Sequence, residues 1–253
     1  MITEGQAAIV SGGASGLGGA TADMLAAAGA KVAIFDMNAD LGRAKAKALN
    51  GAFFQVDVTD ANKVAAAIAD AEGLHGKARI LVNCAGIGPA AKVIDRSGLA
   101  YSLEAFNAVI NVNLSGTFNV LSRFAAALHD AEPLGEERGV IINTASVAAF
   151  DGQIGQAAYS ASKGGVVGMT LPIARELARY GIRVMTIAPG MFLTPMLETL
   201  SEEIRASLGA QVPFPRRLGQ PAEFAQLVQS IISNPVLNGE TIRLDGAIRM
   251  APR

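Results

Sequence analysis

Short, nearly continuous runs of apolar residues alternate along this chain with longer segments whose apolar positions recur at helical spacing. A short uninterrupted apolar run is typical of a strand that is covered on both faces. The runs predict strands at residues 7–11, 31–35, 52–56, 79–83, 140–144, 183–188 and 241–244. The segments between them predict helices at residues 16–28, 39–49, 61–73, 103–129, 157–180 and 221–233, with a further short helix near 197–208. The pattern therefore predicts an α/β chain, a doubly wound sheet of about seven parallel strands with helices on both faces.

No internal repeat, low-complexity tract or linker interrupts this alternation, which indicates a single domain over residues 1–253. The most irregular stretch, at about 189–219, is rich in proline and glycine and follows the sixth predicted strand. Ligands of such sheets bind at the carboxyl ends of the strands. We therefore expect this stretch to form a lid over a small molecule.

Composition narrows the class of protein. Of the 253 residues, 51% are apolar and 17% are charged, and the net charge is −1. A chain so nearly neutral has no general attraction to nucleic acid or to anionic membranes. The low charge, the few aromatic residues and the absence of tryptophan indicate that some apolar surface is buried between subunits.

Several absences in the sequence bear on location and on metals. Cys84 is the one cysteine, so no disulfide forms within the chain and no oxidising compartment is required. No apolar run reaches the roughly 18 residues of a membrane span. Residues 1–5 lack a targeting presequence, and neither His75 nor His129 has metal-ligand spacing around it. We expect a cytoplasmic protein without a metal site.

Three residues are candidates for acid–base chemistry. Tyr159 and Lys163 are four residues apart in the predicted helix 157–180 and share one of its faces. A phenol accepts protons poorly at neutral pH because its ordinary pKa is about 10, and a nearby ammonium lowers that pKa. Ser146, from a separate element, is able to hydrogen-bond the carbonyl or alcohol oxygen of a substrate. Taken alone, the Tyr-x-x-x-Lys spacing on an amphipathic helix is usually a solvated surface pair, so the other motifs of the chain decide its meaning.

A glycine-rich loop joins the first predicted strand to the first predicted helix, with the spacing Gly-x-x-x-Gly-x-Gly. Glycines permit a tight turn, and the start of a helix offers free N–H groups and a positive dipole end to a pyrophosphate. The candidate cofactor-binding residues here are Ser11, Gly12, Ser15, Gly16, Leu17 and Gly18. A structural turn is the alternative, but the position between strand and helix favours a dinucleotide site.

Asp36 ends the second predicted strand, 18 residues after Gly18. A carboxylate at this position accepts hydrogen bonds from the ribose hydroxyls and repels a 2′-phosphate. No Arg or Lys stands at positions 36 to 38 to balance such a phosphate, so the sequence favours NAD over NADP. The alternative for Asp36 is an N-cap of the helix that follows Asn38.

Two further strand ends hold candidate cofactor contacts. Asp57 and Val58 follow the third strand and are candidates for the adenine edge, although an Asp there is as often a simple cap. Asn83, Ala85 and Gly86 follow the fourth strand, where a dinucleotide crosses the sheet.

These motifs, in this order, resemble those of the short-chain dehydrogenase/reductase family over essentially the whole chain. The matching features are the glycine loop, an Asn-Asn-Ala-Gly element with Cys84 in place of its second Asn, the serine, the Tyr-x-x-x-Lys pair and a Pro-Gly after the sixth strand. The resemblance implies a Rossmann fold and reversible hydride transfer between a carbinol carbon and a nicotinamide dinucleotide. It further implies that Tyr159 is the acid and base and that Ser146 stabilises the substrate oxygen. Lys163 would lower the pKa of Tyr159 and hold the nicotinamide ribose.

Other family positions carry over residue by residue. Asn113 matches the family's helix asparagine, which supports a water relay behind Lys163. Thr194 matches the position that contacts the nicotinamide carboxamide, and Pro189 and Gly190 match the family's Pro-Gly, with Pro189 bordering the ring.

Longer stretches are similar to a subgroup of the family that interconverts 3-hydroxyacyl-CoA and 3-ketoacyl-CoA with NAD. They cover residues 139–150, 153–165, 212–219 and 238–250. The resemblance implies this activity, in fatty acid metabolism, with tolerance for hydroxysteroids or other secondary alcohols. It places Gln153 in the substrate half of the pocket, where it would bond a thioester or keto oxygen; a polar residue at a helix entry is the alternative.

Two other functions remain open at this stage. One is an NADPH-dependent 3-oxoacyl-carrier-protein reductase, which has the same catalytic residues, and the other is a non-catalytic dinucleotide-binding scaffold. By analogy with the family, we expect a homotetramer that pairs through the two long predicted helices, 103–129 and 157–180.

Overall fold

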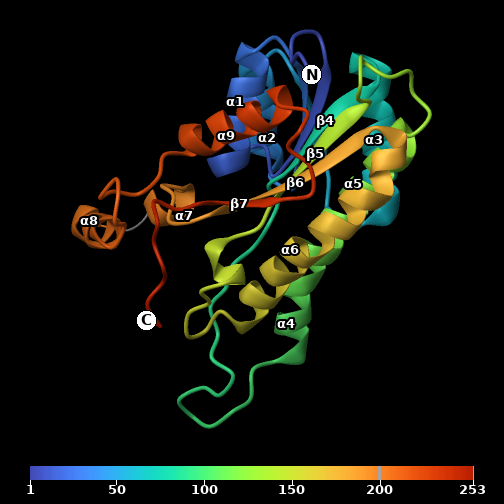
Figure 1. The fold of residues 1–253 in the computed structure, drawn as a ribbon. Coiled ribbons are helices and arrows are strands. Elements are labelled where there is room, and N and C mark those ends of the chain that lie inside the picture. Colours follow the sequence, from blue (N-terminus) through green and yellow to red (C-terminus); the bar gives the residue numbers. More distant parts are fainter. Residues whose placement is uncertain (199–200, 253) are drawn as a thin grey trace.

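The computed structural model describes residues 1–198 and 201–252, and in them a single sheet of seven parallel strands has the order β3-β2-β1-β4-β5-β6-β7 (Figure 1). The strands are β1 Ala7–Ser11, β2 Lys31–Asp36, β3 Ala52–Gln55, β4 Ala78–Asn83, β5 Gly139–Thr144, β6 Ile182–Pro189 and β7 Thr241–Leu244. The chain first winds outward from β1 to β3 and then crosses over to β4, so the order reverses between β1 and β4. This is the predicted doubly wound α/β fold, and the reversal places the ligand crevice at the ends of these two strands.

Helices cover both faces of the sheet (Figure 1). One face carries α1 Gly16–Ala27, α2 Ala39–Ala48 and α9 Pro221–Ser233 over a core that includes Leu25 and Phe224. The other face carries α3 Ala61–His75, α5 Thr117–Leu128 and α6 Ala157–Leu177 over a core that includes Phe35 and Phe124. Both faces of the central strands are therefore dry, which explains their continuous apolar runs. In the described part of the chain, no helix combines the length and apolarity that crossing a bilayer requires.

The long helix predicted at 103–129 is interrupted. It consists of α4 Leu103–Ile110, the π-helical turn η1 Asn111–Gly116 and α5. The Thr117 hydroxyl donates to the Asn113 carbonyl oxygen at 2.7 Å, which satisfies a carbonyl inside the wide turn. Such a turn inserts a residue without breaking the helix, so apolar periodicity alone did not reveal it. The helix predicted at 157–180 is α6 followed by the short 3₁₀ turn η3 Ala178–Tyr180.

The lid region holds two helices, α7 Pro195–Glu198 and α8 Glu202–Ala210, instead of the one predicted near 197–208; residues 199–200 lie outside the described residues. Its two ends meet beside the sheet. The N–H of Leu193 donates to the Gly219 carbonyl oxygen at 2.8 Å, and the N–H of Gly219 donates to that of Met191 at 2.9 Å. The region predicted to be a lid is therefore a loop whose two ends are hydrogen-bonded to each other beside the sheet.

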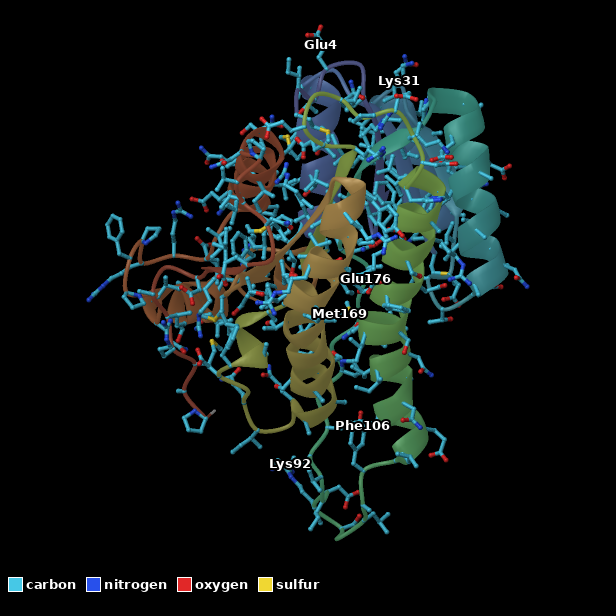
Figure 2. The ribbon with its side chains drawn as sticks, turned by 45° about the vertical axis from the view of Figure 1, so that its right-hand side comes forward. Glu4, Lys31, Lys92, Phe106, Met169 and Glu176 are labelled. Atoms are coloured by element: carbon cyan, nitrogen blue, oxygen red, sulfur yellow. The ribbon has the colours of Figure 1, made fainter. Side chains whose placement is uncertain are left out.

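An arm between β4 and α4 was not predicted. It extends beyond the end of the sheet and carries Lys92, with Phe106 on the adjoining α4 (Figure 2). Within it, Ile94 pairs with Ala100 in an isolated antiparallel bridge. The N–H of Ala91 donates to the Gly155 carbonyl oxygen at 2.9 Å, which ties the arm to the segment before α6.

Replacing Gly18 by Ala is expected to lower the free energy of unfolding by about 2 kcal/mol or more, because the new Cβ would lie 2.2 Å from the Gly12 carbonyl oxygen. Gly19 is the matched control, since a Cβ there meets its nearest neighbour at 3.6 Å and Ala is the better helix former. Urea denaturation of both variants measures the difference. Equal stability of the two would contradict this packing.

Candidate active site

Two adjoining cavities occupy the carboxyl edge of the sheet, one of about 590 Å³ beside the glycine loop and one of about 510 Å³ beside α6. Both are lined by Leu17, Cys84, Gly86, Ile87 and Thr194. The cavities are thus two parts of one cleft. A ligand with two unlike halves fits such a cleft, each half in its own cavity.

The glycine loop forms a close backbone cradle at the first cavity. Gly12 has a φ of +65°, and a Cβ on it would lie 2.7 Å from the Ala85 nitrogen. Gly16 also has a positive φ, +55°. Side chains would close this approach, so the loop fits a group that contacts backbone N–H groups, as a pyrophosphate does. Of the predicted loop residues, those that line this cavity are Gly12, Ser15, Gly16, Leu17 and Gly18.

Ser11 and Asn83 lie beneath the cavity, inside the sheet. The Ser11 hydroxyl donates to Oδ1 of Asn83 at 3.1 Å, and Nδ2 of Asn83 donates to Oδ1 of Asn143 at 3.0 Å. The three side chains stand at one register of β1, β4 and β5. Among the described residues these two predicted contacts are not part of the cavity wall; they fix the strands on which the cavity rests.

Asp36 holds the glycine loop as well as facing the cavity. Its Oδ2 accepts from the Ala14 N–H at 3.1 Å and its Oδ1 accepts from the Asn38 N–H at 2.9 Å. The N-cap of α2 is Asn38, whose Oδ1 accepts from the Leu41 N–H. The alternative of Asp36 as that N-cap is therefore wrong.

The ends of β3 and β4 complete this half. Asp57 and Val58 line the cavity, and Oδ1 of Asp57 also accepts from the Thr59 N–H at 2.9 Å. The Thr59 hydroxyl donates to the same oxygen at 2.7 Å, and the two hydrogen bonds lower the pKa of Asp57. Asp57 is thus a turn cap that also faces the cavity. Ala85 and Gly86 form the wall between the two halves.

Asn113, on η1, is fully buried and lines neither cavity, and its side chain is occupied. Its Oδ1 accepts from the Ile87 N–H at 2.8 Å, and its Nδ2 donates to the Ile87 carbonyl oxygen at 2.8 Å and to Oγ of Ser162 at 3.1 Å. The amide clamps the start of the arm against α6. A Cβ on Gly86 would lie 3.1 Å from this Oδ1 and 3.6 Å from Nζ of Lys163, so the clamp sits beside the lysine.

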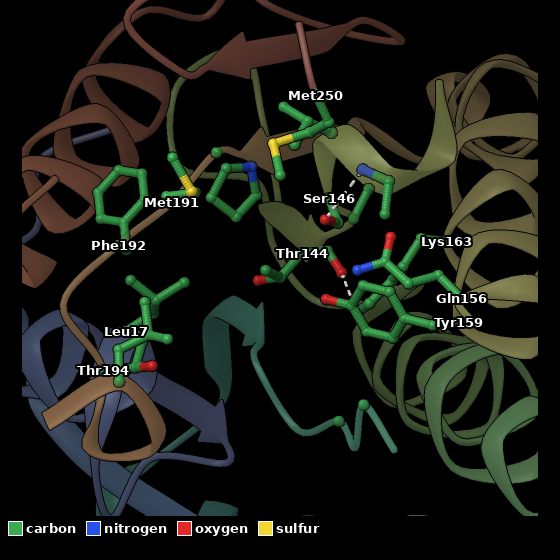
Figure 3. A pocket seen from close by; sticks show the side chains of 18 of the residues that line it. Leu17, Thr144, Ser146, Gln156, Tyr159, Lys163, Met191, Phe192, Thr194 and Met250 are labelled. Atoms are coloured by element: carbon green, nitrogen blue, oxygen red, sulfur yellow. Dashed lines mark hydrogen bonds between the residues drawn. The ribbon is translucent and has the colours of Figure 1, made fainter. Parts of the chain in front are cut away.

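Ser146, Tyr159 and Lys163 meet in the second cavity (Figure 3). Ser146 lies after β5, as the N-cap of the 3₁₀ turn η2 Val147–Ala149, and its Oγ accepts from the Ala148 N–H at 3.1 Å. Tyr159 and Lys163 share a face of α6, as predicted. Nζ of Lys163 donates to the Thr144 carbonyl oxygen at 2.8 Å and lies 5.7 Å from the centroid of the Tyr159 ring.

The predicted lowering of the Tyr159 pKa by Lys163 is wrong for the protein alone. Burial raises the pKa of Tyr159, opposed by the neighbouring Ser146 hydroxyl. Burial also lowers the pKa of Lys163 to about 8. Nζ of Lys163 is directed at a backbone carbonyl, and desolvation of the phenolate is the largest effect on the Tyr159 pKa. At neutral pH the phenol is therefore protonated.

The C-terminal segment closes one side of the second cavity. Met250 lines it, and Nε2 of Gln153 donates to the Ala251 carbonyl oxygen at 2.9 Å. Arg243 anchors the segment, because its Nη2 pairs with Asp151 at 2.5 Å. The amide nitrogen of Gln153 is thus bound to the chain itself.

A second glutamine, Gln156, also lines this cavity, as do Pro189, Gly190 and Thr194. Sequence reasoning missed it. The signal was its spacing of three residues before Tyr159, which places the two on one side of the helix start.

Comparisons with known proteins agree with this geometry. The family model described as short chain dehydrogenase matches residues 6–205. The chain is 57% identical to a Homo sapiens protein named 3-hydroxyacyl-CoA dehydrogenase type-2, over 98% of this chain and 97% of that one. It is 35% identical to a 3-oxoacyl-[acyl-carrier-protein] reductase of Thermotoga maritima, over 98% and 99%. A crystal structure of 3-hydroxyacyl-CoA dehydrogenase type-2 from Mycobacterium avium aligns with a TM-score of 0.95 at 45% identity, covering 98% of each chain.

Replacing Lys163 by Met is expected to abolish turnover and yet raise the free energy of unfolding at pH 7 by about 1–3 kcal/mol. The pKa of the lysine falls from 10.5 to about 8 on folding. Between these values the unfolded chain binds the extra proton, so the lysine opposes folding fully below pH 8 and less as pH rises toward 10.5. Urea denaturation at pH 7 and pH 10 measures the effect.

The control for this measurement is Lys63→Met. The Lys63 side chain is 65% exposed, and its loss should change stability by about 0.5 kcal/mol or less. A Lys163→Met variant that is less stable than the wild type at pH 7 would contradict the cost of burying this charge.

Proposed function

This chain belongs to the short-chain dehydrogenase family, and from that premise we propose that it is an NAD-dependent dehydrogenase that interconverts 3-hydroxyacyl-CoA and 3-ketoacyl-CoA. The observation that carries the proposal is one cavity holding Ser146, Tyr159 and Lys163 next to a glycine-loop cavity. The substrate class follows from the relatives at 45% and 57% identity. Hydroxysteroids and other secondary alcohols are further candidate substrates.

Tyr159 is the proton donor and acceptor in this proposal. In reduction, the buried and protonated phenol donates its proton to the substrate oxygen as that oxygen gains negative charge. In oxidation, the phenol must first lose its proton, which burial opposes. When bound, the oxidised dinucleotide supplies the hydride acceptor and a fixed positive charge. Lys163, at the Gly86 end of the cleft, adds to the field that favours the phenolate.

Ser146 positions and stabilises the reacting oxygen. Its Oγ already accepts from the Ala148 N–H, so its own proton is free to be donated to a substrate oxygen in the cavity. Asn113 acts at one remove, because its amide binds Ile87 and Ser162. We propose that it holds the wall around Lys163 and so supports the proton relay expected from the family.

The predicted cofactor residues that line the two cavities are assigned to the dinucleotide. We propose that the N–H groups from Gly12 to Gly18 hold its pyrophosphate and that Asp36 holds the adenosine ribose. Asp57 and Val58 would border the adenine. Thr194, Pro189 and Gly190 would border the nicotinamide, since they line the cavity that contains Tyr159.

The alternative of an NADPH-dependent 3-oxoacyl-carrier-protein reductase is less well supported. The relative of that name is 35% identical, against 57% for the dehydrogenase. No basic residue stands at positions 36 to 38. A non-catalytic scaffold does not agree with the family membership or with the assembled acid–base residues.

We further propose a homotetramer that pairs through α5 and α6. A groove of about 360 Å³ between these helices is lined by Phe118, Leu121, Ala125 and Ile173. Phe118 is 52% exposed, which a second copy would cover. The cytoplasmic location and the place in fatty acid metabolism stay predictions.

Replacing Tyr159 by Phe is expected to lower kcat for acetoacetyl-CoA by about 10²-fold or more, because the ring keeps its packing but loses the exchangeable proton. The dissociation constant of NADH, measured by fluorescence titration, should stay within about twofold of that of the wild type. Activity near that of the wild type would refute the role of the phenol.

Replacing Asp36 by Asn is expected to lower the NAD-over-NADP preference in kcat/KM by about tenfold or more, because the amide no longer repels a 2′-phosphate. Asn keeps one acceptor for the Ala14 or Asn38 N–H, so the loop should hold its shape. Rates with NADH and NADPH on acetoacetyl-CoA measure the preference. A wild type that already prefers NADPH would favour the carrier-protein reductase.

A further inference from the structure

Gln156 stands at the start of α6, three residues before Tyr159, and lines the cavity that contains Ser146 and Tyr159. Its amide points into this cavity, toward the oxygens of these two side chains (Figure 3). Nothing in the reaction described above uses it.

The orientation of this amide is fixed by the turn that precedes α6. Oε1 of Gln156 accepts from the Gln153 N–H at 3.0 Å, and the Gln156 N–H donates to the Gln153 carbonyl oxygen at 3.0 Å. A backbone N–H can only be met by the oxygen of the amide. The nitrogen, Nε2, must therefore be the end that faces the cavity, and within the described residues it donates to no protein group.

The other glutamines of this cavity differ. Gln153 has its Nε2 bound to the Ala251 carbonyl oxygen at 2.9 Å, and Gln211 is exposed on the lid, far along the chain from α6. Gln156 alone among the three combines a locked side chain with a place one turn from the catalytic phenol.

We propose that Nε2 of Gln156 donates a hydrogen bond to the thioester carbonyl oxygen of the substrate. This inference rests on the proposed function. A 3-ketoacyl thioester has two carbonyl groups separated by one methylene, and the reacting one lies at Ser146 and Tyr159. Gln156 is the N-cap of α6 and Tyr159 is the third residue of that helix, and both line one cavity, so the two side chains are able to donate to two oxygens carried on either side of one methylene.

The consequence is selection for a second oxygen beside the reacting carbon. A substrate that lacks the thioester oxygen leaves Nε2 facing a methylene, without a partner and partly shielded from water. Gln156 would then be a residue that determines substrate specificity, and it would act on the substrate directly.

Two substrates that differ only at this carbonyl test the proposal. Acetoacetyl-CoA has the thioester oxygen, and S-(3-oxobutyl)-CoA has the same ketone and the same CoA with a methylene in its place. We expect Gln156→Met to lower kcat/KM for acetoacetyl-CoA by about tenfold and to leave that for S-(3-oxobutyl)-CoA within about twofold. Where turnover of the thioether is slow, its inhibition constant against acetoacetyl-CoA gives the same comparison.

Two variants serve as controls. Gln156→Glu keeps an oxygen for the Gln153 N–H but presents a second oxygen to the cavity, so the loss with acetoacetyl-CoA should exceed that of Gln156→Met. Gln211→Met should change kcat/KM for the two substrates by the same factor. Equal losses on both substrates with Gln156→Met, or none, would overturn the inference. A wild type that reduces no acetoacetyl-CoA with either dinucleotide would instead overturn the proposed function.

Discussion

Nζ of Lys163 donates a hydrogen bond of 2.8 Å to the Thr144 carbonyl oxygen at the end of β5. This contact joins the sheet to α6, the helix that also carries Tyr159. The lysine is 5% exposed, and its burial lowers its pKa to about 8. Gly86 stands next to it, where a Cβ would lie 3.6 Å from Nζ. The fold thus tolerates an unfavourable charge beside Tyr159, the residue proposed to transfer the proton.

Those parts of the site that depend on local pattern were predictable from the sequence. The strands β1, β4 and β5 are continuous apolar runs, so their ends, and with them the glycine loop and Ser146, were placed correctly. Tyr159 and Lys163 needed only helical spacing. The doubly wound order followed from the alternation of strands and helices, since right-handed crossovers leave few other arrangements.

What escaped prediction depends on contacts between distant segments. The π-helical turn at Asn111–Gly116 inserts a residue without ending the helix, and Asn113 within it binds Ile87, which is far away in the sequence. The direction of the Tyr159 pKa shift depends on how deeply the ring is buried, and sequence spacing does not reveal the depth of burial. Spacing distinguishes Gln156, three residues before Tyr159, from Gln153, but it does not reveal that the C-terminal segment binds the amide nitrogen of Gln153.

The loop at about 189–219 is closed at its base by two backbone hydrogen bonds, from the Leu193 N–H to the Gly219 carbonyl oxygen and from the Gly219 N–H to the Met191 carbonyl oxygen. Because the ends are already joined, lengthening or shortening the loop changes its closure entropy only slowly. Thr194 and Pro195, at the start of the loop, line the glycine-loop cavity, whereas Leu208 and Gln211 line only the second cavity. A change of loop length near Leu208 would therefore reshape the second cavity and leave the glycine-loop cavity as it is.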